Sequence, residues 1–228
     1  MKKSIDHTIL RTVVLIILIT SCIKNEPNNS VIKDSDGNVY GSVKIGSQTW
    51  LNKDLRTTKY NNGDLIANIS DSSGWRLTTT GAYCWYKNDA HFIPDSQGAL
   101  YNFYVIADKR DVCPAGWHVP SVGEWSTLIN SSGGDSAAGG RLKETGTKHW
   151  AAPNKNARNE FGFSALPGGF RSPQGQDGYI GFVVNWWSSS EADPLKAWSI
   201  YIGFNDGQAG TASSLKRNGF SIRCIKDL

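Results

Sequence analysis

The sequence predicts an α+β fold in which two helices flank a mostly antiparallel sheet with long loops. Three features of the chain support this prediction. The 228 residues include 24 Gly, and glycine is enriched where a chain turns. Two stretches, 97–108 and 121–129, carry apolar residues at the spacing of one helix face. The last third of the chain consists of short apolar runs separated by turn residues, as successive strands would be.

The N-terminus has the features of a targeting segment. Three cationic residues precede a short apolar run, 12–20, and this order is typical of a secretory signal peptide. The run ends in the letters ITSC, which resemble the lipobox of bacterial lipoproteins, whose cysteine is lipid-modified. We therefore predict a lipoprotein signal peptide over 1–21 and lipid attachment at Cys22; an ordinary signal peptide is the alternative.

Lipid attachment would tether the chain to a membrane without spanning it. Residues 22–33 are polar and lack periodicity, so we expect a flexible linker there and a single domain over 34–228. The expected location is the cell envelope, as an outer-membrane lipoprotein, with exposure at the cell surface as one orientation. Half of the net charge of +4 lies before Cys22, and the remainder is too scattered for a nucleic-acid-binding protein.

The domain begins with a predicted β-hairpin, 38–44 and 48–51, around a Gly-Ser turn. The letters DSDGN at 34–38 lack the glycine and glutamate spacing of an EF-hand loop, so they predict a turn rather than a calcium site. The aromatic run GAYCWYKND at 81–89 predicts a strand.

Two helices are expected in the middle of the domain. The first, 97–108, has apolar residues at i, i+3, i+4 and i+7 from Leu100. The second, 121–129, begins with Ser121 and Glu124 at the spacing of a capping box, followed by an apolar stripe.

The remaining chain predicts loops and strands. Residues 131–140 are rich in Ser, Gly and Ala and predict a loop, and the segment FGFSALPGGFR predicts a strand that ends at its Pro-Gly-Gly, 167–169. The segments NWWSSSE, KAWSIYIGF, GQAGTAS and GFSIRCI then predict successive short strands with tight turns.

Three cysteines follow Cys22 in the chain: Cys84, Cys113 and Cys224. An exported chain folds in an oxidising compartment, where a disulfide is the default. We favour Cys113–Cys224, which closes a loop of about 110 residues and would stabilise the fold by about 4–5 kcal/mol. Cys84–Cys113 is the main alternative. An unpaired Cys84 would pack as a small apolar residue.

Eight segments occur in an order found in one known family: DGNVYGSVKIGSQTWLNKDL, GAYCWYKND, GALYNFYV, CPAGWHVPSVGEW, FGFSALPGGFR, WWSSSE, AWSIYIGFNDG and KRNGFSIRCIKD. Over 34–228 the chain resembles the Fibrobacter succinogenes major paralogous domain family. The resemblance implies an exported protein, often a lipoprotein, in a family mostly without assigned activity.

That family in turn is similar to the C-type-lectin-like fold, including its formylglycine-generating-enzyme branch. The similarity implies a twisted antiparallel sheet with two flanking helices and long loops that often bear the ligand site.

Cys113 and His118 are the candidate pair for nucleophilic catalysis, which needs a thiolate beside an imidazole. A disulfide partner for Cys113 argues against this role. The formylglycine-generating branch uses a cysteine pair, whereas Cys224 is the single cysteine in the last hundred residues. We therefore predict no enzyme activity and no catalytic residue.

The histidines predict no zinc site, because His91, His118 and His149 lack the close spacing that zinc ligands usually show. Arg171 and Arg223 predict structural roles, since an arginine turned into a glycine-rich sheet can satisfy several carbonyls or a carboxylate.

A ligand site is expected in the loops after the tryptophan pair. Lectins of this fold often hold calcium with acid and amide oxygens, and the candidates here are Glu191, Asp193, Asn205 and Asp206. These residues do not reproduce the lectin motifs Glu-Pro-Asn or Trp-Asn-Asp, and the last two also fit an ordinary hairpin turn. We predict no cofactor, with calcium as the one ion that the sequence leaves open.

Three tryptophans of the last third, Trp186, Trp187 and Trp198, are candidates for stacking on sugar rings. Neighbours on a strand alternate faces, so one of the adjacent pair is expected to face outward. The predicted ligand-binding set is Trp187, Glu191, Asp193, Asn205 and Asp206.

The predicted function is that of a lipid-anchored envelope protein whose non-catalytic domain binds a glycan, a surface polymer or a protein. Such a module predicts an exposed aromatic and polar cleft near 185–206. A structural subunit of a surface complex is the first alternative, and it predicts a broad apolar patch. An envelope enzyme is the second, and it predicts groups with shifted pKa values in one pocket.

Overall fold

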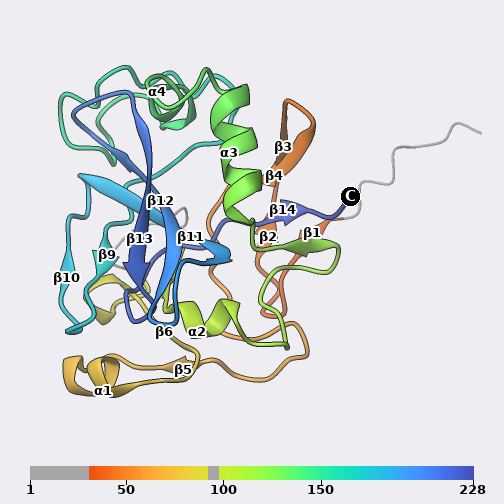
Figure 1. The fold of residues 1–228 in the computed structure, drawn as a ribbon, viewed down its shortest axis with the longest axis vertical. Coiled ribbons are helices and arrows are strands. Elements are labelled where there is room, and N and C mark those ends of the chain that lie inside the picture. The colour runs from red at the N-terminus through yellow and green to blue at the C-terminus, as the bar shows by residue number, and fades with distance from the viewer. Residues whose placement is uncertain (1–30, 92–97) are drawn as a thin grey trace, which may run out of the picture. The chain divides into compact units, whose positions relative to one another are not determined.

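The computed structural model describes residues 31–91 and 98–228, which form small sheets, mostly antiparallel, with a few helices (Figure 1). This confirms the α+β class. The predicted signal peptide, 1–21, and the predicted lipidation site, Cys22, lie outside the described residues. Among the residues described, no helix is long and apolar enough to cross a membrane.

The folded domain begins slightly earlier than predicted. Strand β1 (Ile32–Lys33) pairs with β2 (Val39–Tyr40), so the last residues of the predicted linker belong to the domain. The carboxylate of Asp34 accepts hydrogen bonds from the Asn38 backbone N–H (3.0 Å) and from the Tyr40 hydroxyl (2.6 Å). The DSDGN segment is therefore a turn closed by its own aspartate, as predicted.

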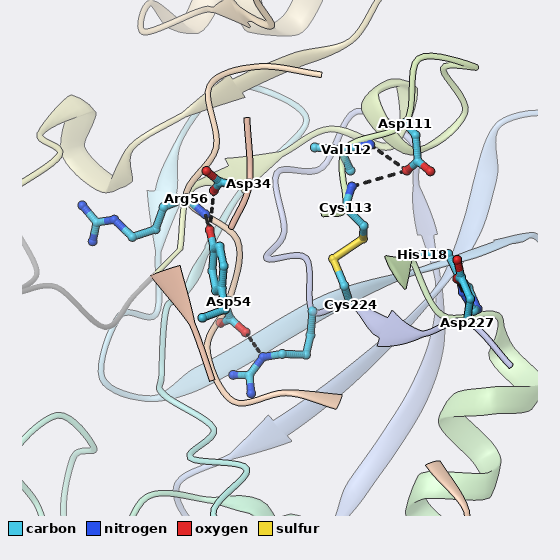
Figure 2. The surroundings of a disulfide bond; sticks show 11 residues. Asp34, Asp54, Arg56, Asp111, Val112, Cys113, His118, Cys224 and Asp227 are labelled. Atoms are coloured by element: carbon cyan, nitrogen blue, oxygen red, sulfur yellow. Dashed lines mark hydrogen bonds and ion pairs between the residues drawn. A yellow bond between two sulfur atoms is a disulfide. The ribbon is translucent and has the colours of Figure 1, made fainter. Parts of the chain in front are cut away.

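The predicted hairpin belongs to a four-stranded sheet. Its strands, in spatial order, are β3 (Ser42–Ile45), β4 (Gln48–Leu51), β14 (Ile225–Lys226) and β8 (Trp117–His118). The last strand of the chain thus lies between two strands that come much earlier in the sequence. A Cys113–Cys224 disulfide, with Cα atoms 6.1 Å apart, joins the segments that lead into β8 and β14 (Figure 2). Cys84 is buried and unpaired, so the favoured pairing is confirmed.

A second small sheet has the order β5 (Ala67–Asn68), β6 (Ala82–Cys84) and β7 (Leu100–Tyr101), with β5 and β6 parallel. Helix α1 (Ser72–Leu77) connects β5 to β6, and the 3-10 helix η1 (Tyr86–Asn88) follows β6. The predicted strand over 81–89 is therefore three residues of strand followed by a turn of helix.

The predicted helix over 97–108 is wrong for most of its length. Residues Leu100 and Tyr101 form β7, and helix α2 is only Phe103–Ile106. The extended backbone is held by distant partners, because the backbone of Tyr101 exchanges hydrogen bonds with Phe220 (2.8 and 3.0 Å). The side chain of Asn102 adds two more hydrogen bonds. Its amide oxygen accepts from the Ala82 N–H, and its amide nitrogen donates to the Thr80 carbonyl. This tertiary pairing overrides the helical periodicity.

The second predicted helix is confirmed as α3 (Val122–Ser131). Its capping box is complete, because the Ser121 hydroxyl accepts from the Glu124 N–H while the Glu124 carboxylate accepts from the Ser121 N–H. Trp125 and its apolar neighbours on α3 pack against the large sheet described below.

The predicted loop over 131–140 is also wrong in part, since helix α4 (Ala138–Leu142) begins within it. The glycines within α4 itself allow close packing. A Cβ atom at Gly139 would lie 2.0 Å from the Gln208 carbonyl oxygen, so only glycine lets α4 approach that turn. The described residues thus hold four α-helices, α3 being the longest, instead of two flanking ones.

The largest strands form one antiparallel sheet of β11 (Val183–Glu191), β12 (Lys196–Gly203) and β13 (Ala209–Leu215). The short hairpin of β9 (Phe170–Arg171) and β10 (Asp177–Gly178) precedes it. Helix α3 covers one face of β11 and β12 (Figure 1). On that face Trp125 stacks on Trp186, with ring centroids 5.5 Å apart. This sheet positions the candidate site.

Candidate ligand-binding site

The tryptophan pair of β11 lies in the core. Trp186 and Trp187 are both 0% exposed, so the prediction that one faces outward is wrong. Trp186 donates its indole N–H to Asp54 (2.8 Å), and Trp187 donates to the Tyr101 carbonyl (2.8 Å). Both faces of β11 are covered, one by α3 and the other by a cluster that includes Phe220. Trp187 therefore presents no surface to a ligand.

The four calcium candidates do not converge. Glu191 forms an ion pair with Lys216 (3.0 Å), and the Asp193 carboxylate closes the β11–β12 turn. Asn205 and Asp206 lie in the β12–β13 turn, at the other end of a strand about 23 Å long at the usual rise per residue. Within the described residues, no group of three His, Cys, Asp or Glu side chains could hold a metal ion. The predicted set therefore does not form one ion site.

Asn205 and Asp206 instead line a hollow of about 320 Å³ at the Gly203 end of β12. We call this hollow the polar recess. It is lined by Tyr179, Phe182, Val183, Tyr201, Gly203, Phe204, Asn205, Asp206, Gln208 and Gly210. It combines exposed aromatic rings with amide and carboxylate groups, which is the composition expected of the predicted cleft.

Tyr179 is the most exposed ring of the polar recess, at 65%. One face of its ring stacks on Phe170, with centroids 5.4 Å apart and planes 16° from parallel. Its backbone φ is +62°, a region in which a bulky non-glycine residue is strained. The Tyr179 carbonyl accepts from the N–H groups of Phe182 and Val183, which fixes the turn. Strain held this firmly clusters at ligand sites.

The other three rings of the polar recess are also held in place. Phe182 packs edge-on against Phe204 at 5.1 Å. The ring of Tyr201 covers Gly210 on the neighbouring strand, because a Cβ atom there would lie 2.3 Å from the tyrosine Cζ. Gly210 therefore lets Tyr201 lie flat on the sheet. The three rings are preorganised, which lowers the entropy lost when a ligand binds.

The polar groups of the recess lie on the β12–β13 turn. Asp206 accepts the Gln208 N–H through one carboxylate oxygen (2.9 Å). The side-chain amide of Asn205 makes no hydrogen bond to any residue that the structure describes, and it is exposed. It can therefore donate to and accept from a ligand.

A buried lysine, which the sequence analysis missed, fixes this turn. The Lys143 ammonium donates to the carbonyls of Lys155, Gly203 and Asp206 at 2.7–2.9 Å. Desolvation by burial lowers the pKa of Lys143 to about 8. Two of the three carbonyls belong to residues that line the polar recess, so Lys143 sets the shape of its rim. Nothing in the local sequence distinguishes this lysine from an exposed one.

The candidate catalytic residues, Cys113 and His118, do not form a thiol–imidazole pair. Cys113 is bonded to Cys224, and Figure 2 shows His118 beside Asp227. The His118 ring lies 2.6 Å from Asp227 and 2.9 Å from Glu124. Burial alone would lower the pKa of His118, but the two carboxylates outweigh it and raise the pKa above its usual value. His118 thus ties the C-terminal segment to the start of α3.

The other histidines and the two arginines lie in different parts of the domain and do not form a common site. His149 bonds Glu144 (2.7 Å), and His91 is exposed on a turn. Arg223, 1% exposed, donates to Asp54 (2.6 Å) and to two carbonyls. Arg171, equally buried, donates to the Ser70 carbonyl and to an asparagine. The structural roles predicted for both arginines are confirmed.

A family model described as the Fibrobacter succinogenes major domain matches residues 43–226. No curated protein and no solved structure matches the chain. The matched range covers the four-stranded sheet apart from Ser42, and it includes the disulfide, α3 and the polar recess. The chain therefore belongs to the Fibrobacter succinogenes major domain family.

Proposed function

We propose that the domain is a non-catalytic binding module for a glycan and that the polar recess is its site. The observation that carries this proposal is the meeting of two exposed tyrosine rings, Tyr179 and Tyr201, with the side chains of Asn205 and Asp206 in one hollow. Aromatic faces pack against the apolar face of a sugar ring, and a few placed polar groups hold its hydroxyls.

The chemistry of the recess supports binding rather than hydrolysis. Most glycoside hydrolases use two carboxylates flanking the scissile bond. Among the described residues that line the polar recess, Asp206 is the single carboxylate. Because the calcium candidates lie at opposite ends of β12, we propose that binding needs no calcium.

The wider setting of the module is proposed from the sequence. The targeting segment supports a lipoprotein anchored through Cys22 in the envelope, as an outer-membrane protein that meets glycans of that envelope or of a surface polymer. The C-type-lectin-like fold is proposed from the order of the eight segments and from the disulfide that closes the domain. Mass spectrometry of the mature chain, showing an acylated cysteine at its N-terminus, would test the anchor.

The proposed function is tested by a glycan array probed with the purified full-length chain, with and without a calcium chelator. We expect binding to a small set of glycans that the chelator leaves unchanged. The variant Tyr179→Ala should lose this binding. The variant Leu195→Ala, which removes an exposed apolar side chain at the opposite end of the same sheet, should keep it. An array with no bound glycan would contradict the proposal.

A further inference from the structure

A second hollow adjoins the polar recess. It measures about 360 Å³ and is lined by Tyr86, Gly178, Tyr179, Ile180 and Phe182. We call it the apolar recess, because all its side chains are aromatic or aliphatic. Tyr179 and Phe182 line both hollows. The two recesses therefore form one continuous surface, divided by a ridge made of these two rings.

The two rings of the ridge are exposed to solvent and are held in fixed positions. Tyr179 and Phe182 are 65% and 44% exposed, and a hydrogen bond from the Phe182 N–H to the Tyr179 carbonyl (3.0 Å) joins them. Below the ridge, aromatic contacts run from Phe170 to Phe220 and on to the buried Trp187. The ridge is thus packed against the core. A ligand that lies across it therefore binds a preorganised surface.

The charge of the surface restricts the ligand. No Lys, Arg or His is among the described residues that line either recess, and Asp206 is the single carboxylate. Recognition of a phosphate, sulfate or carboxylate group relies on cationic donors. The surface therefore favours an uncharged ligand over an anionic polymer.

The size of the two recesses restricts the ligand further. Each hollow lies near the lower limit of about 300 Å³ for small-molecule sites. One hollow suits a single small unit, and the pair suits two units joined across the ridge.

We propose that the site takes at least two linked units of an uncharged glycan, one in each recess, rather than a single terminal sugar. This inference rests on the proposed function and goes beyond it by stating the class and the minimum length of the ligand. The polar recess would hold the hydroxyls of one unit, and the apolar recess would pack against the less polar face of the next.

Calorimetric titration of the full-length chain with neutral oligosaccharides of one to six units tests this inference. The probes are the glucose, xylose, mannose and N-acetylglucosamine series. For the series that binds, we expect the association constant to rise about tenfold or more between one and three units and then to level off, because the second unit binds as part of the same molecule.

A glycine offers a way to fill the apolar recess alone. A Cβ atom at Gly178 would meet nothing closer than Phe170 Cζ at 4.0 Å, so this position has room for a Cβ atom, and Gly178→Leu adds an apolar side chain to the lining of the recess. We expect this variant to lose the gain in affinity with chain length, because the recess proposed for the second unit is filled. The matched control is Gly123→Leu on the exposed side of α3, where the nearest atom lies at 3.9 Å; it should behave as wild type.

The outcomes separate the two proposals. Binding that is independent of chain length, or a Gly178→Leu variant that keeps the full gain, would overturn the inference and leave the glycan-binding function standing. Binding of anionic oligosaccharides in preference to neutral ones would also overturn it. Failure of every probe to bind, on the array and in solution, would overturn the proposed function together with the inference.

Discussion

The segment 111–125, which we call the disulfide frame, and the polar recess differ in one respect. The frame has the more reactive side chains, but the polar recess has the side chains that are free to contact a ligand. The frame contains a cysteine, a histidine and a glutamate, but each already has partners: Cys113 in a disulfide, His118 between two carboxylates, and Glu124 in a capping box. The polar recess has tyrosines and an asparagine, which are less reactive, yet these are exposed. Groups satisfied within the fold stabilise it, whereas exposed groups with spare hydrogen-bonding capacity can bind a ligand.

The largest effect on stability is expected at the buried ion pair beside the frame. Asp54 and Arg223 are 2% and 1% exposed, and Asp54→Ala would leave the guanidinium buried without its carboxylate. We expect a loss of about 3–5 kcal/mol in the free energy of unfolding, measured by urea denaturation. The control Glu160→Ala breaks an exposed pair with Arg141 and should cost below about 1 kcal/mol. Equal losses in the two variants would refute this ranking.

The next effect is expected at the disulfide itself. Replacing Cys113 and Cys224 together by Ala should lower the free energy of unfolding by about 2–5 kcal/mol, while the folded fraction keeps its glycan binding. Peptide mapping without reduction should recover these two cysteines in one linked pair of peptides. A linked pair containing Cys84 would contradict the structure, and loss of binding by the folded variant would make the frame part of the site.

A smaller effect on stability, together with an effect on binding, is expected at Gly210. Gly210→Val would push the Tyr201 ring off the sheet, because its Cβ would lie within the space of that ring. We expect the stability to change by about 1 kcal/mol and the affinity for the array glycan to fall severalfold, although residue 210 itself offers no new polar group. An unchanged affinity would show that the flat position of Tyr201 is not used.

The smallest effect is expected from the titration of His118. Asp227 and Glu124 raise the pKa of His118 in the folded chain, so the folded state binds its proton more tightly than the unfolded state does. The resulting stability is fully present below the ordinary histidine pKa of about 6.5 and is lost as the pH rises through the higher folded value. Relative to His118→Gln, the wild type should therefore lose stability as the pH rises above about 6.5.

Urea denaturation of both proteins at several pH values between about 5.5 and 8.5 measures this difference. His91→Gln, which changes an exposed histidine on a turn, is the control and should track the wild type at every pH. A difference between wild type and His118→Gln that grows with rising pH would have the wrong sign for the contacts described.

The sequence predicted well what depends on neighbours in the chain. The capping box of α3 uses residues three apart, and the β3–β4 hairpin turns on two residues, so local patterns contain both. The Cys113–Cys224 pairing followed from the expected compartment and the small number of cysteines. The helix predicted over 97–108 failed because Tyr101 pairs with Phe220, a partner far along the chain that the periodicity of a short window does not reveal.

The candidate site depends more than the fold does on contacts between segments that are far apart in the sequence. The prediction for Trp187 failed because α2 and the last segment of the chain cover the second face of β11. Tyr179 and Tyr201 approach the same hollow from different hairpins, and the positive φ of Tyr179 is set by the turn that holds it. Asn205 and Asp206 were predicted as ligand residues because lectins of this fold use acid and amide oxygens, and they line the polar recess without the calcium partners first considered.

The central claim is that the polar recess, and not the chemically richer frame, meets the ligand. The most direct measurement is a parallel calorimetric titration of Tyr179→Ala and His118→Ala with the glycan that binds best on the array. We expect Tyr179→Ala to remain folded but to lose about tenfold or more in affinity, equivalent to about 1.4 kcal/mol, while His118→Ala binds as wild type. Full affinity in Tyr179→Ala together with lost affinity in a folded His118→Ala would contradict it.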